Sequence, residues 1–442
     1  IINKVTVVGN DKTSDHVIIR ELRTRPGQKF SRGDIMRTTR ELSQLGYFDP
    51  EQLGVVPTPN PANGTVDIEY KVVERSNDQV ELSGGWGAGQ VVGSLGLVLN
   101  NFSARKFFDK EAWKPVPSGD GQRASIRIQS NGRFFQSYNL SFTEPWLGGK
   151  KPNALTVSAY SSIQSNGVPR DDSRRQSTTI NGVSVSLGKR LTVPDDFFTL
   201  VHSVNYQQFV LNNSRATVYL QNGVSNSFFF RETLSRNSID QPIYPRSGSS
   251  VTLTLQFTPP YSLLGRKSFN ELPADQKYRW IEYHKWRFDT QYYLKLVGDL
   301  VLMSRVQYGF LGNYDRNYGN VPFGRFFVGG DGIMGFNLDD RELIGLRGYQ
   351  NFSLTPNDPI TGLANVGATA FQKYTMELRY PITLNPSATI FVTSFLEAGN
   401  SFFRVKEFKP FDNFRSAGAG VRVFLPMFGL LGVDWGYGFD PV

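Results

Sequence analysis

The sequence has no cysteine and only three histidines among its 442 residues. Disulfide bonds, thiolate metal sites and a cysteine nucleophile are therefore excluded. His16, His202 and His284 lie far apart in the sequence, without the spacing of a metal-binding motif, so we expect no bound metal. The G-x-S-x-G motif of serine hydrolases is also missing. We therefore expect a protein that is not an enzyme and that needs no cofactor.

Long apolar runs are missing as well. The longest nearly uncharged apolar segment, residues 91–99, has about nine residues, whereas a membrane-spanning helix needs about 20. The formal net charge is +9, which is compatible with nucleic acid, with anionic lipid or with no specific partner. No basic run is dense enough to favour nucleic acid. With 34 Phe and 19 Tyr, the chain is too aromatic to be disordered.

Residues 1–75 contain both strand and helix patterns. Apolar residues predict a first strand near the N-terminus, and Ser14 is a candidate cap for a short helix after it. Ser31 predicts the start of a second helix, which Gly46 ends. Alternating apolar and polar residues then predict two further strands, the second over 66–73.

The order strand, helix, helix, strand, strand, with Gly46-Tyr47-Phe48 after the second helix, resembles a POTRA domain. POTRA domains are the periplasmic modules of barrel-type protein-translocating machines. We therefore interpret residues 1–75 as one periplasmic POTRA domain, the last of several in such a protein. The alternative is a generic small α+β domain without a binding role.

From about residue 80 onward, within the barrel region assigned to residues 76–442, apolar and polar residues alternate, and helical spacing is almost absent. Each segment of this kind has one apolar face and one polar face that is rich in charge. The alternation suits a soluble sandwich with its apolar face inward, or a membrane barrel with its apolar face toward lipid and its polar face around a lumen. The clearest segments are 123–129, 251–257, 285–296 and 374–380.

Aromatic residues and strand length favour the barrel. Aromatic residues gather near predicted strand ends, at 134–135, Trp146 and 228–230, as they do at membrane interfaces. Tilted strands of roughly 9–11 residues leave room for about 16 strands over 76–442. The expected fold class is thus a transmembrane antiparallel β-barrel preceded by one small α+β POTRA domain. The segment 430–439 is expected to be the penultimate strand, so that the closing strand is missing.

A connection of about 55 residues, over about 315–370, separates two predicted strands and is far longer than an ordinary loop. It carries an R-F-F-V-G-G element and then an L-R-G-Y tetrapeptide, and a later strand carries F-L-E-A-G. The residues that define these motifs are Arg325, Phe326, Gly329 and Gly330; Leu346, Arg347, Gly348 and Tyr349; and Phe395, Glu397 and Gly399.

These motifs resemble those of the BamA family of outer-membrane protein insertases. That family has an R-F-x-x-G-G stretch and a V/L/I-R-G-F/Y tetrapeptide in its sixth extracellular loop, which folds back into the barrel. It also has an F-x-D-x-G strand motif, in which Glu397 here replaces the usual Asp. The resemblance spans nearly the whole chain and implies the C-terminal portion of such a protein, because family members normally carry several POTRA domains.

We expect Arg347 to bind Glu397. A guanidinium inside a barrel needs a carboxylate, since an unpaired charge there is costly and a bidentate pair fixes the geometry. Such a pair would fasten the long loop to the barrel wall. The alternative is that the Arg-Gly-Tyr sequence merely forms a turn, because this tripeptide is common in turns.

In the BamA family the first and last barrel strands meet at a weak seam, and incoming precursors pair with the edge of the first strand. The predicted first strand here, residues 80–89, is rich in glycine, which weakens strands. An open edge offers N–H and C=O groups that a client strand can satisfy. A sharp bend or close packing at a barrel corner is the other explanation for the glycines. The residues assigned to the seam are Val80, Leu82, Gly84, Gly85, Gly87 and Gly89.

The resemblance implies an insertase of the bacterial outer membrane, with the POTRA domain in the periplasm. Its partners would be unfolded outer-membrane protein precursors, accessory assembly lipoproteins bound through POTRA domains, and outer-membrane lipids with lipopolysaccharide, but no nucleic acid. One alternative is a two-partner-secretion or TamA-like translocation factor of the same superfamily. A passive porin and an outer-membrane enzyme are alternatives from other classes.

Overall fold

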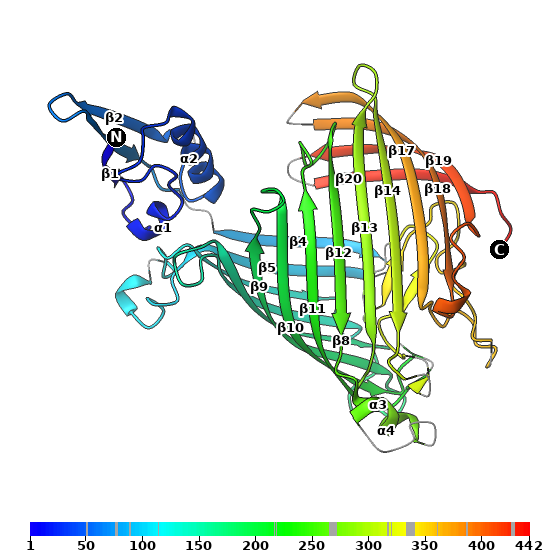
Figure 1. The fold of residues 1–442 in the computed structure, drawn as a ribbon. Coiled ribbons are helices and arrows are strands. Elements are labelled where there is room, and N and C mark those ends of the chain that lie inside the picture. The colour runs from blue at the N-terminus through cyan, green and yellow to red at the C-terminus, as the bar shows by residue number, and fades with distance from the viewer. Residues whose placement is uncertain are drawn as a thin grey trace. The chain divides into compact units, whose positions relative to one another are not determined.

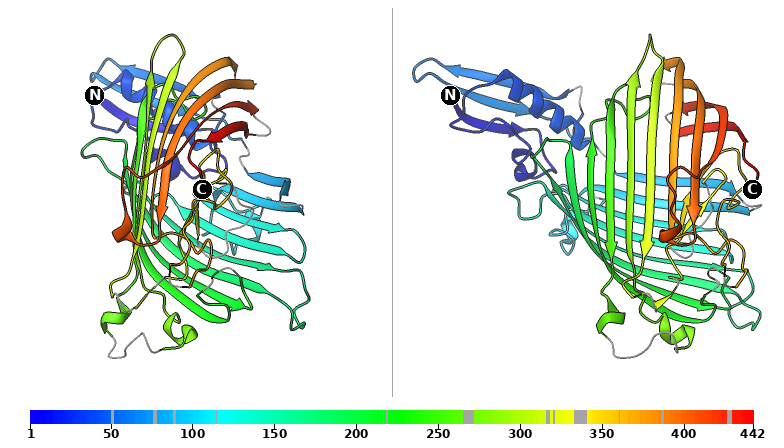
Figure 2. Two further views of the ribbon diagram at one scale, coloured as in Figure 1. Left: turned by 90° about the vertical axis from the view of Figure 1, so that its right-hand side faces the viewer. Right: turned by 45° about the vertical axis from the view of Figure 1, so that its right-hand side comes forward.

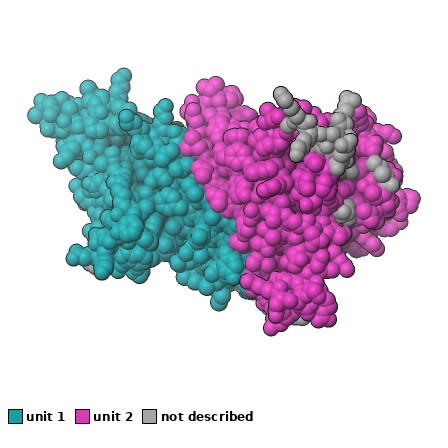
Figure 3. Space-filling model, turned by 90° about the horizontal axis from the view of Figure 1, so that it is seen from below, with its two compact units in different colours: residues 1–86, 90–131, 137–160 teal, residues 87–89, 132–136, 161–442 magenta. Residues whose placement is uncertain are grey.

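The structure, a computed structural model, describes residues 1–49, 52–75, 78–87, 90–113, 115–215, 217, 219–264, 272–315, 318–319, 321–332, 341–359, 361–385, 388–425 and 429–442. The chain divides into two compact units (Figure 3). The first comprises 1–86, 90–131 and 137–160, and the second comprises 87–89, 132–136 and 161–442. Among the described residues, no helix is long and apolar enough to cross a membrane.

The first unit begins with a small domain of three strands and two helices (Figure 1). The strand β1 (Ile2–Val8) pairs in parallel with β3 (Thr65–Lys71), and β3 pairs antiparallel with β2 (Gly54–Asn60). The helices α1 (Asp15–Ile19) and α2 (Arg32–Leu45) lie between β1 and β2 in the chain. The order strand, helix, helix, strand, strand is the one that the sequence predicts.

The core of this domain lies between the helices and the sheet. Ile18 of α1 and Leu42 of α2 are buried with Ile2, Leu22, Phe48, Ile68, Tyr70 and Val72. The helix α2 has the predicted ends, because the Ser31 hydroxyl accepts a hydrogen bond from the Asp34 N–H and Gly46 is left-handed with φ 76°.

Ser14 stands at the cap position of α1, as the sequence predicts, but its side chain makes no cap hydrogen bond. Its backbone N–H instead donates to the Gly119 carbonyl oxygen over 2.8 Å. Gly119 belongs to the loop after the second strand of the large sheet, so the residue that precedes α1 serves to attach this domain to that loop.

Among the described residues, the large sheet has 15 strands, in the order β20-β19-β18-β17-β14-β13-β12-β11-β10-β9-β8-β7-β6-β5-β4. Each neighbour along this order is also the next strand of the sheet along the chain, as in an up-and-down meander of hairpins. The strands are β4 (Gln79–Gly87), β5 (Gln90–Phe102), β6 (Gln122–Ser130), β7 (Phe135–Glu144), β8 (Asn153–Ser165), β9 (Ser177–Arg190), β10 (Phe198–Asn212), β11 (Gly223–Asn237), β12 (Gly248–Phe257), β13 (His284–Lys295), β14 (Val301–Gly312), β17 (Ala370–Asn385), β18 (Ala388–Phe402), β19 (Phe414–Leu425) and β20 (Gly429–Gly438).

The sheet agrees with the expected antiparallel barrel of about 16 strands, since 15 strands lie among the described residues. The predicted penultimate strand is β20, which pairs with β19 and ends the order on one side, whereas β4 ends it on the other. Figure 2 shows the long strands of the second unit side by side. Short helices occupy connections outside the sheet: α3 (Tyr261–Leu264), α4 (Ala274–Lys277) and the 3-10 helices Lys110–Ala112 and Val405–Glu407.

The sheet exposes its apolar face and covers its charged face. In β13, Trp286 is 45% exposed, whereas the side chain of its neighbour Lys285 is only 3% exposed. In β17, Met376 and Leu378 are exposed and Glu377 between them is buried. A soluble protein shows the reverse arrangement. The two faces therefore suit a sheet that has hydrocarbon outside and a polar interior, and they exclude a water-soluble sandwich.

The turn between β7 and β8 contacts the N-terminal domain. Trp146 Nε1 donates a hydrogen bond to Glu21 Oε1 over 2.7 Å, and the Arg20 guanidinium lies over the Trp146 ring and 3.9 Å from Glu144. Trp146 follows the end of β7, as predicted, and its ring packs on the N-terminal domain, a contact that the sequence does not predict. Burial raises the pKa of the Glu21 carboxyl, although the Trp146 hydrogen bond and the Arg20 charge both act in the opposite direction.

Substitution of Leu42 by Ala should destabilise the N-terminal domain by about 2–5 kcal/mol, because it leaves a cavity in the buried core. Met36 on the same helix is 65% exposed, so Met36→Ala should change stability by about 0.5 kcal/mol or less. The measurement is the rate of trypsin cleavage within residues 1–75 of the folded full chain at increasing urea concentration. Equal cleavage of the two variants would contradict the described core.

Candidate functional site

The long connection between β14 and β17 lies on the charged face of the sheet. It contains two short strands, β15 (Phe326–Val328) and β16 (Glu342–Ile344), which pair in parallel. Figure 2 shows this connection, in yellow, beside β17 and β18, and β15 contacts both strands. The L-R-G-Y tetrapeptide follows β16, and a bridge between Gly330 and Leu346 joins it to the end of the R-F-F-V-G-G element.

Arg347 and Glu397 are in contact, as the sequence analysis expects. Nε and Nη2 of Arg347 donate to Glu397 Oε1 over 3.1 and 2.8 Å, and the Arg347 backbone N–H donates to Glu397 Oε2 over 2.9 Å. The guanidinium also stacks on the ring of Phe395, 3.5 Å from its centroid. Because Glu397 is buried, this contact fastens the loop to β18.

Arg347 binds two further carboxylates that sequence reasoning missed. Nη2 lies 3.3 Å from Glu377 Oε2 on β17, and Nη1 lies 3.3 Å from Asp434 Oδ2 on β20. Each carboxylate also has a cation on the strands: Lys373 Nζ lies 3.0 Å from Glu397 Oε1, Arg379 Nε lies 2.8 Å from Glu377 Oε1, and Arg422 Nη1 lies 2.7 Å from Asp434 Oδ1. One loop residue therefore joins three strands, including the last strand in the order. The only signal in the sequence was the charged face predicted for segment 374–380.

The two residues after Arg347 lie against β20 and its C-terminal end. Gly348 has φ 92°, and a Cβ atom there would stand 2.8 Å from the Tyr437 carbonyl carbon, so a larger residue would push loop and strand apart. The Tyr349 hydroxyl donates to the Arg415 carbonyl oxygen over 2.8 Å and accepts from the Asp440 N–H over 3.2 Å. The tetrapeptide thus packs against β20.

The remaining motif residues pack the loop against the wall. Leu346 is fully buried, and a Cβ atom on Gly399 of β18 would stand 3.0 Å from its Cδ1. Phe326 is fully buried with its ring centroid 4.7 Å from that of Phe371. Arg325 is buried and donates through Nη1 to the Tyr219 hydroxyl over 2.8 Å. The turn after β15 contains Gly329 and Gly330, both with positive φ.

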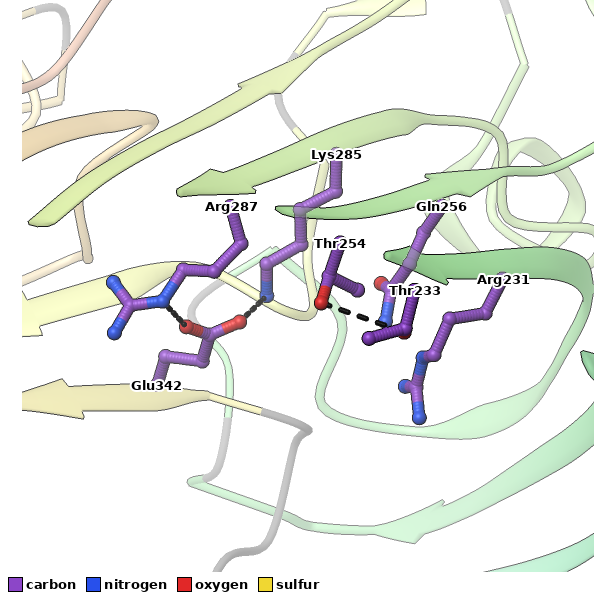
Figure 4. A pocket seen from close by; sticks show the side chains of 7 residues that line it. All are labelled: Arg231, Thr233, Thr254, Gln256, Lys285, Arg287 and Glu342. Atoms are coloured by element: carbon purple, nitrogen blue, oxygen red, sulfur yellow. Dashed lines mark hydrogen bonds and ion pairs between the residues drawn. The ribbon is translucent and has the colours of Figure 1, made fainter. Parts of the chain in front are cut away.

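A second ion-pair cluster, also missed from the sequence, holds β16 (Figure 4). Glu342 lies 2.7 Å from Lys285 Nζ and 3.4 Å from Arg287 Nε, both on β13. Lys285 Nζ also donates to the Gly324 carbonyl oxygen over 2.7 Å. The charged face predicted for segment 285–296 was the available signal. The cluster borders a cavity of about 280 Å³, which is lined by Arg231, Thr233, Thr254, Gln256, Lys285, Arg287 and Glu342.

The residues assigned to the seam lie on β4. This strand is at the opposite end of the strand order from β20, which the loop contacts. Val80 and Leu82 are both exposed. The backbones of Gly84, Gly85 and Gly87 belong to β4, whereas Gly89 lies outside the described residues. In the described part of the chain, no group of three or more His, Asp or Glu residues could hold a metal ion.

Comparisons with known proteins match both parts of the chain. The family model "Omp85 superfamily domain" matches residues 118–441, and the POTRA model, "Surface antigen variable number repeat", matches residues 1–75. A relative is the "Outer membrane protein assembly factor BamA" of Neisseria meningitidis, 24% identical over 450 residues that cover 96% of this chain and 49% of that protein. The chain thus spans about half the length of the curated relatives it matches.

Solved structures share the fold. The structure of BamA from Haemophilus ducreyi lacking POTRA domains 1–3 has a TM-score of 0.67 at 18% identity, with 100% of this chain and 81% of that chain covered. CdiB from Escherichia coli has a TM-score of 0.57 at 12% identity, with 99% and 72% covered. These likenesses confirm the predicted fold class, a transmembrane β-barrel preceded by a POTRA domain.

Substitution of Arg347 by Ala should release the loop, because the loop then loses its ion pairs to Glu377, Glu397 and Asp434, which each keep a cation on the strands. Hydrogen bonds to charged groups contribute about 1.5–3 kcal/mol each. The measurement is protease cleavage of the loop in the folded full chain. The control is Arg174→Ala, which removes an exposed arginine paired with Asp172 and should leave cleavage unchanged. Normal protease resistance of the loop in Arg347→Ala would contradict the proposed anchor.

Proposed function

The chain belongs to the Omp85 superfamily, and from that premise we propose that it folds β-barrel precursors and inserts them into the bacterial outer membrane beside β4. The barrel lies in the outer membrane and the POTRA domain in the periplasm. The proposed reaction needs no catalytic residue and no cofactor, because strand pairing and burial of apolar side chains supply the free energy.

The observation that carries the proposal is the unequal support of the two end strands. On β20, Asp434 binds Arg347, and the backbone around Tyr437 lies against Gly348. The strand β4 carries three glycines within nine residues and β20 carries four within ten, so both strands are rich in glycine and the loop contacts of β20 distinguish them. Glycine weakens a strand through backbone entropy and the lack of a packing side chain. A seam between these strands would therefore open by movement of β4.

An opened edge of β4 presents backbone N–H and C=O groups that are costly to leave unpaired in hydrocarbon. A precursor strand satisfies them by β-augmentation, and each further hairpin then pairs with the strand before it. The anchored loop keeps β20 in place during this exchange. Precursors of outer-membrane barrels are thus the proposed clients.

Further partners follow from the same proposal. The relatives in the comparisons are named assembly factors, and accessory lipoproteins would bind through POTRA domains. The outer surface of the barrel meets outer-membrane lipid, and the net charge of +9 suits contact with the phosphates of lipopolysaccharide.

Secretion of a substrate through the lumen is the second candidate function, since CdiB shares the fold. Two features of the polar face disfavour it. The anchored loop occupies that face, and Tyr244, from the turn between β11 and β12, reaches across it. The Tyr244 hydroxyl lies 2.9 Å from the Asp299 carbonyl oxygen and 3.0 Å from that of Arg379. A luminal substrate would have to displace both.

Depletion of the full-length protein in its host distinguishes these functions. The proposal predicts that many unrelated barrels disappear from the outer membrane. Loss of a single secreted product, with the other barrels unchanged, would favour the secretion function. A passive porin would instead show steady single-channel conductance in the isolated barrel.

The double substitution Gly85→Val and Gly87→Val should stiffen β4 by about 1–2 kcal/mol and slow precursor insertion by a factor of about 5–30. The measurement is the insertion rate of a client barrel into liposomes that contain the full chain. Gly93→Val on β5 is the matched control, because a Cβ atom there meets nothing closer than 3.9 Å. Unchanged rates in a folded double variant would contradict the weak-seam account.

A further inference from the structure

The loop between β5 and β6, residues 103–121, exposes a cluster of aromatic side chains. Phe108 is 92% exposed, and Phe107 and Trp113 are each almost half exposed. Soluble surfaces seldom carry such a cluster unless it binds something. In Figure 1 the loop, in cyan, projects beyond the ends of the first strands of the large sheet.

The three rings form one unit, which we call the aromatic cluster. The ring of Phe107 packs edge-on against Phe108, with centroids 5.3 Å apart, and against Trp113, with centroids 5.5 Å apart. Trp113 Nε1 donates to the Phe107 carbonyl oxygen over 3.0 Å, so the polar atom of the indole is already satisfied. The cluster therefore offers an apolar surface.

The loop holds this cluster in a fixed position. The Ser103 hydroxyl donates to Asp120 Oδ2 over 2.8 Å, and the Ala104 N–H donates to Gln122 Oε1 over 2.7 Å. Lys106 Nζ donates to the Ser118 carbonyl oxygen over 3.1 Å. These hydrogen bonds join the two ends of the loop. The rings are therefore exposed in the folded loop, without a change in its conformation.

The aromatic cluster continues the lipid-facing side of the sheet. The Phe102 ring, at the end of β5, lies 6.4 Å from Phe107 and 6.4 Å from Phe142. Phe142 shares its face of β7 with the exposed Tyr138 and Leu140, because residues two apart point the same way in a strand. The apolar surface thus runs from the strands onto the loop.

The loop lies at the periplasmic end of these strands. The Ser14 N–H, in the POTRA domain, donates to the Gly119 carbonyl oxygen over 2.8 Å, and the Tyr47 hydroxyl donates to that of Gly121 over 3.2 Å. A Cβ atom on Gly119 would clash with the Lys12 carbonyl oxygen, so the two backbones approach closely. The cluster is therefore at the depth of the periplasmic leaflet.

We propose that the aromatic cluster inserts into the interfacial region of the phospholipid leaflet that faces the periplasm. Aromatic side chains favour this depth, where apolar chains meet polar headgroups. Lys110, which is exposed, lies between the rings in sequence and can bind a lipid phosphate, and Arg105, 75% exposed, lies 3.5 Å from Asp120 and directs its remaining N–H groups outward from the buried carboxylate. The aromatic cluster would hold the membrane close to the first strands of the barrel. This role does not depend on which client the protein handles.

The absence of cysteine permits a direct test, since one introduced cysteine is the only labelling site. The full chain with Phe108→Cys carries an environment-sensitive fluorophore and is placed in nanodiscs of phosphatidylethanolamine and phosphatidylglycerol. We expect a blue-shifted emission that lipids spin-labelled near the headgroup quench and that aqueous iodide does not. The matched control is Met36→Cys on α2, an exposed position in the POTRA domain, which should show the opposite pattern.

Quenching of the label at position 108 by iodide and not by spin-labelled lipid, as at position 36, would overturn the proposal. Protection at position 108 that arises only after addition of a periplasmic protein fraction would also overturn it, because the occupant would then be a protein. Heat-modifiable electrophoretic mobility verifies that each labelled chain is folded, so that the readings refer to the intact barrel.

Discussion

The arrangement of the site depends on one charge, the Arg347 guanidinium on the polar face of the sheet. An arginine cannot lose its proton there, so its charge has to be balanced by carboxylates. Glu377, Glu397 and Asp434 supply the balance from β17, β18 and β20. Because these carboxylates lie on three strands, neutralising one loop residue also fixes where the loop lies and which strands it supports.

A second constraint acts on the outside of the sheet. Hydrocarbon leaves no partner for an unpaired backbone group, so strands in a membrane must pair with one another, and an edge is a place where energy is gained by adding a strand. Both end strands are rich in glycine, and the loop supports β20, at the opposite end of the strand order from β4. The proposed insertion uses this difference between the two end strands, and the aromatic cluster would place lipid next to the weaker one.

Part of this architecture could be predicted from the sequence, and part could not. Periodicity gave the strands and their faces, and the chemistry of a buried guanidinium gave the Arg347–Glu397 contact. Glu377 and Asp434 were missed because their distance from Arg347 depends on the register of separate hairpins, which alternation alone does not fix. The contact of Trp146 with Glu21 was missed because a tryptophan at a strand end suits both lipid and a neighbouring domain, and the sequence alone does not place Glu21 beside it.

The most direct measurement is a double-mutant cycle between Arg347→Ala and Asp434→Asn, read as the protease cleavage rate of the loop in the folded full chain. The account predicts strong coupling. Asp434→Asn alone weakens the anchor, but it has little further effect once Arg347 is gone, because the carboxylate then has no loop charge to bind. Independent, additive effects of the two substitutions would contradict the claim that the loop supports the last strand.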